Sequence, residues 1–226
     1  MTIKAWQGPS TIDGEEIMAV VSCENRASNN DKTGDMVQVG FMRTDMKPSR
    51  AVKEGKDVSI CGGCPLRKKV RDDTGSGMPP CYVATHWKGA QWNAAKAAIE
   101  DLSAAVKAMA KKPVRFGEYG NMSSIPRAIA EKLLKAAKKW TLYEHEWRKE
   151  SNQWLKEYAM ASVHSVEEAL EAQAMGWRTF RTKRPDDPVM GNEVQCPHRT
   201  HGVQCRDCML CMGQSLQAKS VCEHVH

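Results

Sequence analysis

Residues 158–184 read YAMASVHSVEEALEAQAMGWRTFRTKR, and this stretch decides which fold the sequence predicts. An apolar, strand-forming run at each end, 158–163 and 177–182, predicts a buried strand. Between the two runs, the sequence SVEE beginning at Ser165 has the pattern of a capping box, which opens a helix, and Gly176 ends it. A strand, a connecting helix and a second strand predict two parallel neighbours in one sheet.

The same alternation continues on both sides of this stretch. Short apolar runs predict further strands at 16–23, 35–43, 57–61, 81–83, 113–116, 141–147 and 193–196. Apolar residues at helical spacing, together with start and stop signals, predict helices at 48–54, 90–110, 126–140 and 166–175. Ile99 lies on the apolar face of the helix at 90–110, whereas 66–80 is charged and rich in Gly and Pro and predicts a loop.

Repeated alternation predicts an α/β fold with parallel strands. About eight or nine strand candidates in one domain favour a barrel, which usually needs about 250 residues. We therefore expect a trimmed or incomplete (βα)8 TIM-like barrel over 1–192, with a Cys/His metal-binding C-terminal segment, 193–226, packed on it. A doubly wound open sheet is the alternative, although the chain has neither GxGxxG nor GxxxxGK[ST] to bind a nucleotide.

Length and composition exclude several classes of protein. The 226 residues are 41% hydrophobic, enough to build a core, so wholesale disorder is excluded. The sequence contains no run of 18 apolar residues, so we expect no membrane span. The polar start, MTIKAWQGPSTIDG, predicts a cytoplasmic protein. The net charge of +6 is compatible with nucleic-acid binding without establishing it.

The nine cysteines are the most informative composition feature. In a reducing compartment, clustered thiols indicate metal binding or redox chemistry rather than disulfides. The strongest cluster is a C-x8-C-x2-C-x2-C run, and Cys222 and His224 follow it closely. Its members are Cys196, Cys205, Cys208 and Cys211. This spacing predicts a zinc site, with an iron–sulfur cluster as the main alternative.

A second, weaker group consists of Cys61, Cys64 and Cys81. It lacks an adjacent fourth ligand, for which Cys196 and His86 are candidates. A second metal site and a set of free, partly buried thiols are equally compatible with the spacing. A redox-active CxxC is less compatible, because Pro65 and a basic loop follow it instead of a helix.

Polar residues follow several of the predicted strands. In a barrel, the active site forms where strands end, so these residues are candidates for a common rim. They are Gly117, Glu118, Tyr119, Asn121, His145, Glu146, Trp147, Ser162, His164, Arg181 and Arg184, with Cys61 and Cys196 at the ends of two further strands. Each of them taken singly is more often a surface or helix-cap residue.

The stretch 158–184 also resembles a segment of the tRNA-guanine transglycosylase superfamily, in which a strand, a helix and a strand precede a Cys-rich zinc motif. Here CRDCMLC at 205–211 and His224 follow in the same order, and DKTGDMVQVGF at 31–41 is similar to the family's Asp-Ser-Gly-Gly-Phe-Gln segment. The chain departs from the family in its C-x2-C-x2-C spacing, in its length, and in lacking a carboxylate in 177–182. Divergent bacteriophage members insert 7-deazaguanine bases into DNA. If a phage encodes this chain, the resemblance implies a protein of the host cytoplasm.

The resemblance implies a transglycosylase that exchanges guanine for a 7-deazaguanine base in nucleic acid, with DNA favoured over tRNA. It implies a nucleophilic carboxylate, for which Asp35 is the first candidate, Asp31 the second, and Glu118 and Glu146 the alternatives. Substrate contacts would come from Tyr119, His145 and His164, and phosphate contacts from Arg181, Arg184 and the basic residues of 67–71. Zinc would be the bound metal.

Two other classes of function remain open from the sequence. A non-enzymatic zinc module that contacts nucleic acid or a host protein fits the Cys-rich segment and the positive charge equally well. An iron–sulfur enzyme on a partial barrel is the third hypothesis, although the radical-generating CxxxCxxC motif is absent.

Overall fold

The structure is a computed structural model that describes residues 1–23, 31–75, 81–110, 112–184, 186–213 and 218–224. The strands are β1 (Thr2–Pro9), β2 (Glu16–Ser22), β3 (Val37–Arg43), β4 (Val114–Phe116), β5 (Trp140–Thr141), β6 (Tyr143–Glu144), β7 (Met160–Val163), β8 (Thr179–Lys183), β9 (Glu193–Gln195) and β10 (Ser220–His224). The helices are α1 (Pro48–Lys53), α2 (Val58–Cys61), α3 (Lys68–Thr74), α4 (Gly89–Ala97), α5 (Leu102–Met109), α6 (Arg127–Ala136), α7 (Val166–Ala174), α8 (Pro197–His201) and α9 (Cys205–Cys208). Three 3-10 helices are η1 (Thr85–Lys88), η2 (Met122–Ser124) and η3 (Glu150–Glu157).

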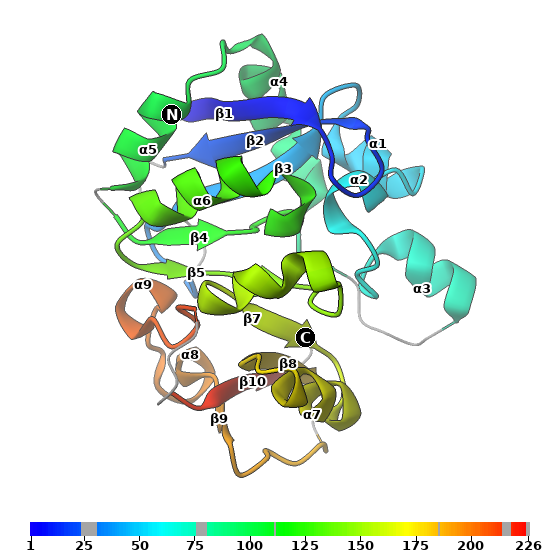
Figure 1. Cartoon of the computed structure of the whole chain (residues 1–226), viewed down its shortest axis with the longest axis vertical. Coiled ribbons are helices and arrows are strands. Elements are labelled where there is room, and N and C mark those ends of the chain that lie inside the picture. The colour runs from blue at the N-terminus through cyan, green and yellow to red at the C-terminus, as the bar shows by residue number, and fades with distance from the viewer. Residues whose placement is uncertain (24–30, 76–80, 111, 185, 214–217, 225–226) are drawn as a thin grey trace.

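The strands form two five-stranded sheets in which parallel pairing dominates (Figure 1). The first has the order β1-β2-β3-β4-β5, and only its β1–β2 and β2–β3 pairs are antiparallel. The second has the order β6-β7-β8-β10-β9 and is parallel throughout. The predicted α/β class is confirmed. The predicted (βα)8 barrel is not, because among the described strands both sheets are open.

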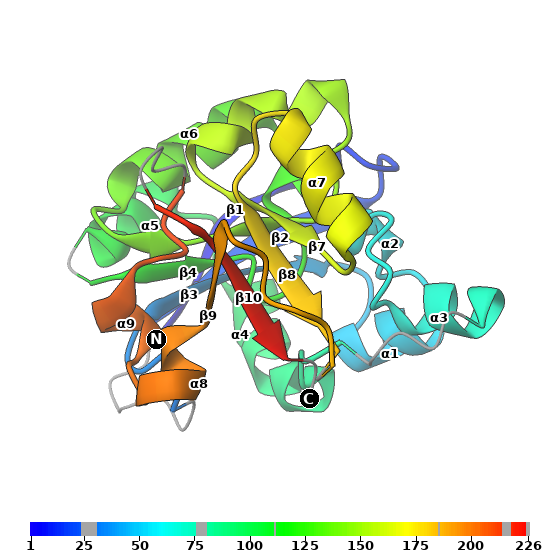
Figure 2. The ribbon, with the colours of Figure 1, turned by 90° about the horizontal axis from the view of Figure 1, so that it is seen from below.

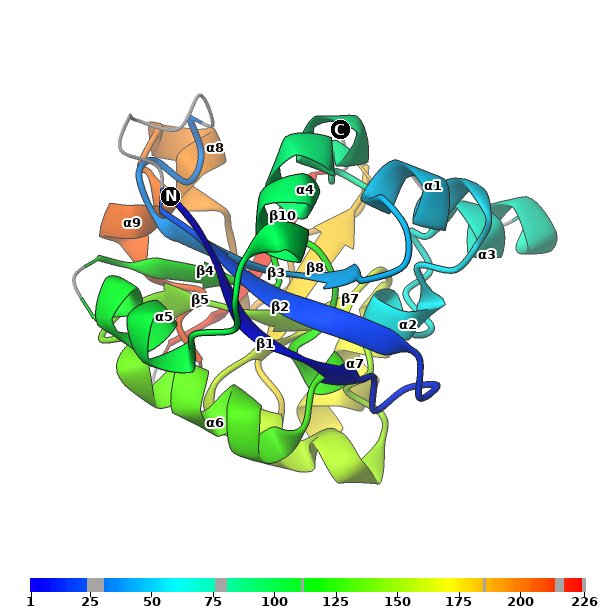
Figure 3. The same ribbon diagram turned by 90° about the horizontal axis from the view of Figure 1, so that it is seen from above.

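The two sheets meet at one short stretch of chain. Only Leu142 separates β5 from β6, and its carbonyl accepts a hydrogen bond of 3.0 Å from the Met160 amide. β5 pairs with β4 on one side, and β6 pairs with β7 on the other. The strand order of the first sheet therefore ends at β5, and that of the second sheet begins one residue later at β6. Figures 2 and 3 show α5, α6 and α7 on one face of this arrangement and α4 on the opposite face.

The stretch that predicted the fold forms as expected. Ser165 caps α7 by accepting a hydrogen bond of 3.1 Å from the Glu168 amide, and the Glu168 carboxylate accepts one of 2.7 Å from the His164 amide. Gly176 follows with a positive φ of 83°, a conformation that glycine adopts without a steric penalty. β7 and β8 then pair in parallel, as the strand–helix–strand pattern predicts.

Three predictions between β3 and η1 are wrong. Residues 57–61, predicted as a strand, contain α2, because a short apolar run does not distinguish a strand from one turn of buried helix. The predicted loop at 66–80 contains α3, which the i,i+4 ion pairs Lys68–Asp72 and Lys69–Asp73 support. Residues 81–83 do not form a strand.

The predicted helix at 90–110 is in fact two helices, α4 and α5. The chain leaves helical geometry at Ala98, and Asp101 caps α5 by accepting a hydrogen bond of 2.8 Å from the Ala104 amide. Glu100 forms a parallel bridge with Lys4 of β1, so contact with the edge strand replaces a helical turn. Ile99, predicted to face the core, is 90% exposed.

Two strands lie where no strand was predicted. β1 is the outer strand of the first sheet, and β10 inserts between β8 and β9. The segment 193–226 therefore contributes two strands, β9 and β10, to the second sheet, in addition to its cysteines.

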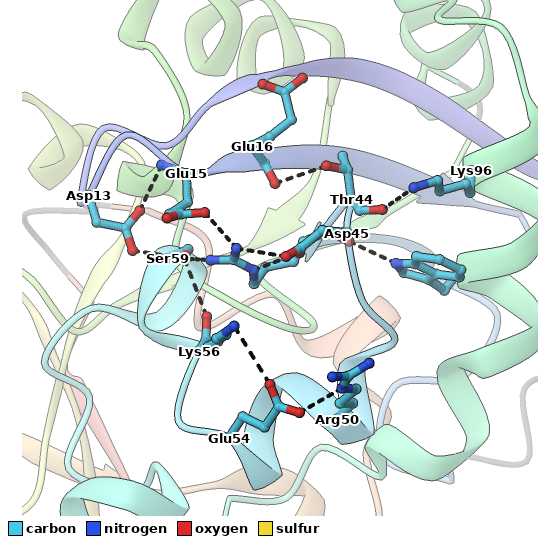
Figure 4. Close-up of polar contacts among 12 residues, drawn as sticks. Asp13, Glu15, Glu16, Thr44, Asp45, Arg50, Glu54, Lys56, Ser59 and Lys96 are labelled. Carbon is cyan, nitrogen blue, oxygen red and sulfur yellow. Dashed lines mark hydrogen bonds and ion pairs between the residues drawn. The ribbon is translucent and has the colours of Figure 1, made fainter.

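A buried arginine at the end of β3 fixes α2 against the first sheet. Arg43 is 6% exposed and donates to Asp45 (2.8 Å), Glu15 (2.6 Å) and the Ser59 hydroxyl (2.7 Å). Ser59 lies in α2 and in turn donates to Asp13 at 2.8 Å, as Figure 4 shows. This network holds the backbone that leads to Cys61.

Candidate functional site

A cavity of about 440 Å³ lies at the C-terminal ends of the parallel strands. Its volume is in the range typical of small-molecule sites. Its polar lining comes from Glu118 and Asn121 after β4, His145 after β6, Ser162 of β7, Thr182 of β8 and Glu223 of β10. Cys64, Leu66, Cys81, Tyr82, Val83, Ala84, Arg115, Gly117, Gly120, Thr141, Tyr143, Phe180, Cys205, Lys32 and Thr33 complete the wall. Of the strand-end residues expected to form a common rim, Gly117, Glu118, Asn121, His145 and Ser162 line this cavity, whereas Tyr119, Glu146, Trp147, His164, Arg181, Arg184, Cys61 and Cys196 do not.

Strand alternation determines which side chains reach the cavity. Phe180 and Thr182 line it, whereas Arg181 between them lies on the other face of β8. Tyr143 and Phe180 form an aromatic pair on the wall, with ring centroids 4.5 Å apart. Such rings offer an apolar surface to a planar ligand.

Glu118 is the carboxylate best placed on the cavity wall. Its side chain is 21% exposed, and Lys88 of η1 forms an ion pair with both carboxylate oxygens. This pair fixes the position of the carboxylate on the cavity wall. A Cβ atom added to Gly40 of β3 would lie 3.2 Å from Glu118 Oε2, so the glycine leaves room for the carboxylate.

His145 is held as a neutral imidazole beside the cavity. Asn121 donates from Nδ2 to the Cys61 carbonyl at 3.0 Å, which leaves its Oδ1 to accept from His145 Nδ1 at 2.9 Å. This assignment gives Nδ1 the proton and leaves Nε2 with a lone pair. Burial lowers the pKa of His145, so it can accept a proton near neutral pH.

His164 lies against His145, with the ring centroids 6.0 Å apart and the planes 18° from parallel. Its Nδ1 is hydrogen-bonded to the Thr182 hydroxyl, whereas its buried Nε2 has no hydrogen-bond partner among the described residues. Burial and the neighbouring His145 lower its pKa to about 3. His164 does not line the cavity itself; it supports residues that do.

The two aspartates predicted as nucleophiles lie outside the cavity. Asp35 precedes β3, at its N-terminal end, and pairs with Lys112 and Arg206 at 3.0 Å each. Hydrogen bonds from these two cations lower its pKa. Asp31 is exposed, and its carbonyl accepts a hydrogen bond from the Gln204 side chain at 3.1 Å.

Four other predicted site residues have structural contacts that keep them off the cavity wall. Glu146 accepts a hydrogen bond from the Gly63 amide and pairs with Lys149. Arg181 is fully buried in an ion pair of 2.7 Å with Glu193. Arg184 is exposed, directly follows β8, and donates its amide to the Asp187 carboxylate at 2.9 Å. Tyr119 is buried, and its carbonyl accepts a hydrogen bond of 2.7 Å from the Phe41 amide. The basic residues of 67–71 belong to α3 and its start, and none of them lines the cavity.

The four cysteines of the C-terminal run lie around one small space. Cys196, Cys205, Cys208 and Cys211 line a cavity of about 20 Å³, and Tyr143 lies beside them. His198, not predicted as a ligand, also lines this space, and its buried Nδ1 has no hydrogen-bond partner among the described residues. Thiols and an imidazole are donor types that zinc uses in proteins. We call these five residues the tail cluster.

Two predicted ligands of the tail cluster lie elsewhere. Cys222 is on β10, and its thiol contacts the Val194 carbonyl at 3.6 Å. His224 ends β10 and does not line the small cavity. Within the described part of the chain, no group of three or more His, Cys, Asp or Glu side chains is arranged as a metal site. A bound metal would therefore have to draw the tail-cluster thiols together.

The first cysteine group also converges. Cys61 ends α2, Cys64 follows in the next turn, and Cys64 and Cys81 both line the large cavity. Burial raises the pKa of all three thiols, that of Cys64 to about 12. Cys196, a candidate fourth ligand, lies in the tail cluster instead.

Sequence patterns did not single out Tyr143, Phe180, Thr182 or Glu223 as site residues. Their signal is the two-residue alternation along β6, β8 and β10, which can be interpreted only once strand pairing gives the inward face. Glu223 is paired with Lys32 at 2.8 Å, a contact between residues far apart in the sequence.

Comparison of the chain with models of protein families, with curated proteins and with solved structures gives no match. None of the described helices is long and apolar enough to cross a membrane.

Proposed function

We propose that the protein is a transglycosylase that exchanges guanine for a 7-deazaguanine base in nucleic acid, with Glu118 in place of Asp35 as the reacting carboxylate. The supporting observation is that Glu118 lies on the cavity wall at the C-terminal end of β4, whereas Asp31 and Asp35 lie outside. Active sites of parallel α/β folds form at that end of the strands.

In the first step, a Glu118 carboxylate oxygen attacks C1′ of the nucleotide. The bond from C1′ to N9 breaks, its electron pair leaves with guanine, and guanine takes a proton from water. Lys88 contacts the carboxylate and holds its position on the cavity wall. A carboxylate suits this chemistry because it also stabilises the oxocarbenium character of the transition state.

In the second step, the incoming base replaces Glu118 at C1′. Its ring nitrogen must lose a proton, and the neutral His145 offers the Nε2 lone pair to accept it. Tyr143 and Phe180 supply aromatic surface for a planar base. We favour DNA over tRNA as the substrate, because this sequence resembles bacteriophage members of the superfamily, and those members act on DNA.

Zinc would be held by the thiols of the tail cluster, with His198 available as an additional ligand. Such a metal would have a structural role, because it would fix the connection between β9 and β10. No step of the base exchange requires it.

The test is incorporation of labelled guanine, or of a labelled 7-deazaguanine, into duplex DNA and into tRNA by the purified protein. We expect incorporation by the unaltered chain and a loss of at least about a hundredfold in Glu118→Gln, which keeps the shape but removes the nucleophile. Asp35→Asn is the matched control, because it alters a carboxylate outside the cavity, and it should retain activity.

Absence of incorporation by the unaltered protein into either nucleic acid would overturn the proposal. Full activity of Glu118→Gln would overturn the role of Glu118, and loss of activity in Asp35→Asn alone would return the role to Asp35.

An iron–sulfur enzyme is the second candidate function. The specific observation in its favour is that the thiols of Cys64 and Cys81 lie on the wall of the same cavity as Glu118. Protein that contains iron and sulfide and fails to incorporate guanine would favour this candidate over base exchange.

A further inference from the structure

Arg115 reaches the wall of the large cavity because of the alternation of side chains along β4. Val114 and Phe116, on either side of it, have no exposed surface and belong to the core. Arg115 itself is half-buried and lines the cavity. Successive side chains of a strand point to opposite faces, so burial of the two apolar neighbours directs the arginine to the cavity.

The charges on the cavity wall leave Arg115 without a counter-ion. The Lys, Arg and Glu side chains that line the cavity are Lys32, Arg115, Glu118 and Glu223. Lys32 and Glu223 form an ion pair of 2.8 Å, and Glu118 is paired with Lys88. Arg115 forms no ion pair or side-chain hydrogen bond with any other residue in the described part of the chain. The wall therefore presents one positive charge that no acidic side chain balances.

Aromatic surface lies next to this charge. Arg115 and Thr141 are direct partners across β4 and β5, and Thr141 also lines the cavity. Tyr143, two residues further along the chain, lines the same cavity, and Leu142 between them is fully buried. Tyr143 in turn forms the aromatic pair with Phe180. The arginine and the two rings therefore belong to neighbouring positions on one wall.

We propose that Arg115 binds the phosphate of a nucleotide whose base lies against Tyr143 and Phe180. The proposal rests on the proposed function, from which it takes a nucleotide as the ligand, and it assigns the group that holds the phosphate. A guanidinium can donate to two phosphate oxygens at once, and bases of any sequence stack on aromatic rings. The residues that the sequence predicted as phosphate contacts do not line this cavity; they are Arg181, Arg184 and the basic residues of 67–71.

The phosphate of a free nucleoside monophosphate and that of a nucleotide within a DNA strand offer the same oxygens to Arg115. The experiment separates these two sources by its probes. Deoxyguanosine, deoxyguanosine monophosphate and a short guanine-containing DNA strand are each titrated into the purified full chain, and calorimetry gives the three dissociation constants.

Arg115→Met is the decisive variant, because it removes the charge and keeps much of the length of the side chain. We expect it to bind a phosphate-bearing probe at least about tenfold more weakly than the unaltered protein does. Its affinity for deoxyguanosine, which has no phosphate, should be unchanged, and circular dichroism should show the fold unchanged. Arg115→Lys should lose less affinity, since it keeps the charge but not the two-point contact.

Arg127→Met is the matched control. Arg127 is an exposed arginine at the start of α6, pairs with Glu131 and does not line the cavity. The variant makes the same change of net charge, so it should bind all three probes as the unaltered protein does.

Unchanged affinity of Arg115→Met for both the monophosphate and the DNA strand would overturn the proposal, and so would an equal loss in Arg127→Met. A loss with the monophosphate would support a free nucleotide as ligand, and a loss with the DNA strand alone would support a nucleotide within a strand.

The binding experiment and the incorporation experiment can fail separately. Protein that binds phosphate through Arg115 but incorporates no base would retain this proposal and overturn base exchange. Incorporation by a protein whose binding does not depend on Arg115 would retain base exchange and overturn this proposal alone.

Discussion

The two sheets bury different kinds of side chain. The first sheet buries Ile17, Val20, Val39 and Phe41 with no exposed surface. The second sheet fully buries the Arg181–Glu193 ion pair and also Glu144. Its Met160, Cys196, Cys211 and Val221 form a small apolar cluster of their own, whereas Ala161 and Val163 of β7 join the core that the first sheet buries.

This difference in composition implies a difference in what stabilises each sheet. Apolar burial stabilises the first sheet and depends little on pH or salt. Charged pairs, hydrogen bonds and thiols stabilise the second, and their contribution depends on protonation and on metal. Chelation, acid and charge substitutions should therefore affect the second sheet first.

Arg181→Met should have the largest effect on stability. It would leave the buried Glu193 carboxylate without its partner and lower the free energy of unfolding by about 3–5 kcal/mol. Adding Glu193→Leu should restore most of the free energy of unfolding, because the unpaired buried charge is then removed. Urea unfolding of the single and double variants measures both effects.

Phe41→Ala in the first sheet provides the contrast. It should cost a similar amount, about 3–5 kcal/mol, through a cavity that no change of charge can repair. If Arg181→Met changed the unfolding free energy by less than about 1 kcal/mol, the buried pair would not be important for the second sheet.

Acid should destabilise the protein through His164, which follows β7 in the second sheet. Its pKa is about 3 in the folded chain against an ordinary 6.5, so below pH 6.5 the unfolded chain binds a proton that the folded chain does not. The contribution of His164 to the free energy of unfolding is therefore fully present above pH 6.5. It is lost as the pH drops towards 3, by up to about 1.4 kcal/mol per pH unit. His164→Asn should remove this slope. Denaturant unfolding at a series of pH values would measure it, and an equal slope in the variant would refute the assignment.

Asp35→Asn should have the smallest effect. Asp35 connects the start of β3 to Arg206 of α9 through a partly exposed ion pair, so it joins the two regions at the surface. Such pairs contribute about 0–1 kcal/mol, and salt screens them. A loss well above this range in a thermal or urea titration would show that the contact between the two regions is stronger than a surface pair allows.

The sequence predicted local structure well where the hydrophobic pattern agreed with the start and stop signals of helices and strands. The SVEE capping box and Gly176 bracket α7 as expected, and strands at 16–23 and 35–43 match β2 and β3. It failed where a distant contact overrode the local pattern, as at Ala98, where the bridge to β1 interrupts a helix that continuous alanines favour.

For the candidate site, the sequence determined the residue types and their local spacing. Both cysteine groups, Glu118 and His145 could be selected in this way, because strand ends and short Cys spacings are local properties. Only the tertiary structure decided which carboxylate faces the cavity. Strand pairing assigns Glu118 to the wall, Asp35 to the opposite end of the sheet and Arg181 to the far face, since side chains alternate across a strand and their direction is fixed only when the neighbouring strand is known.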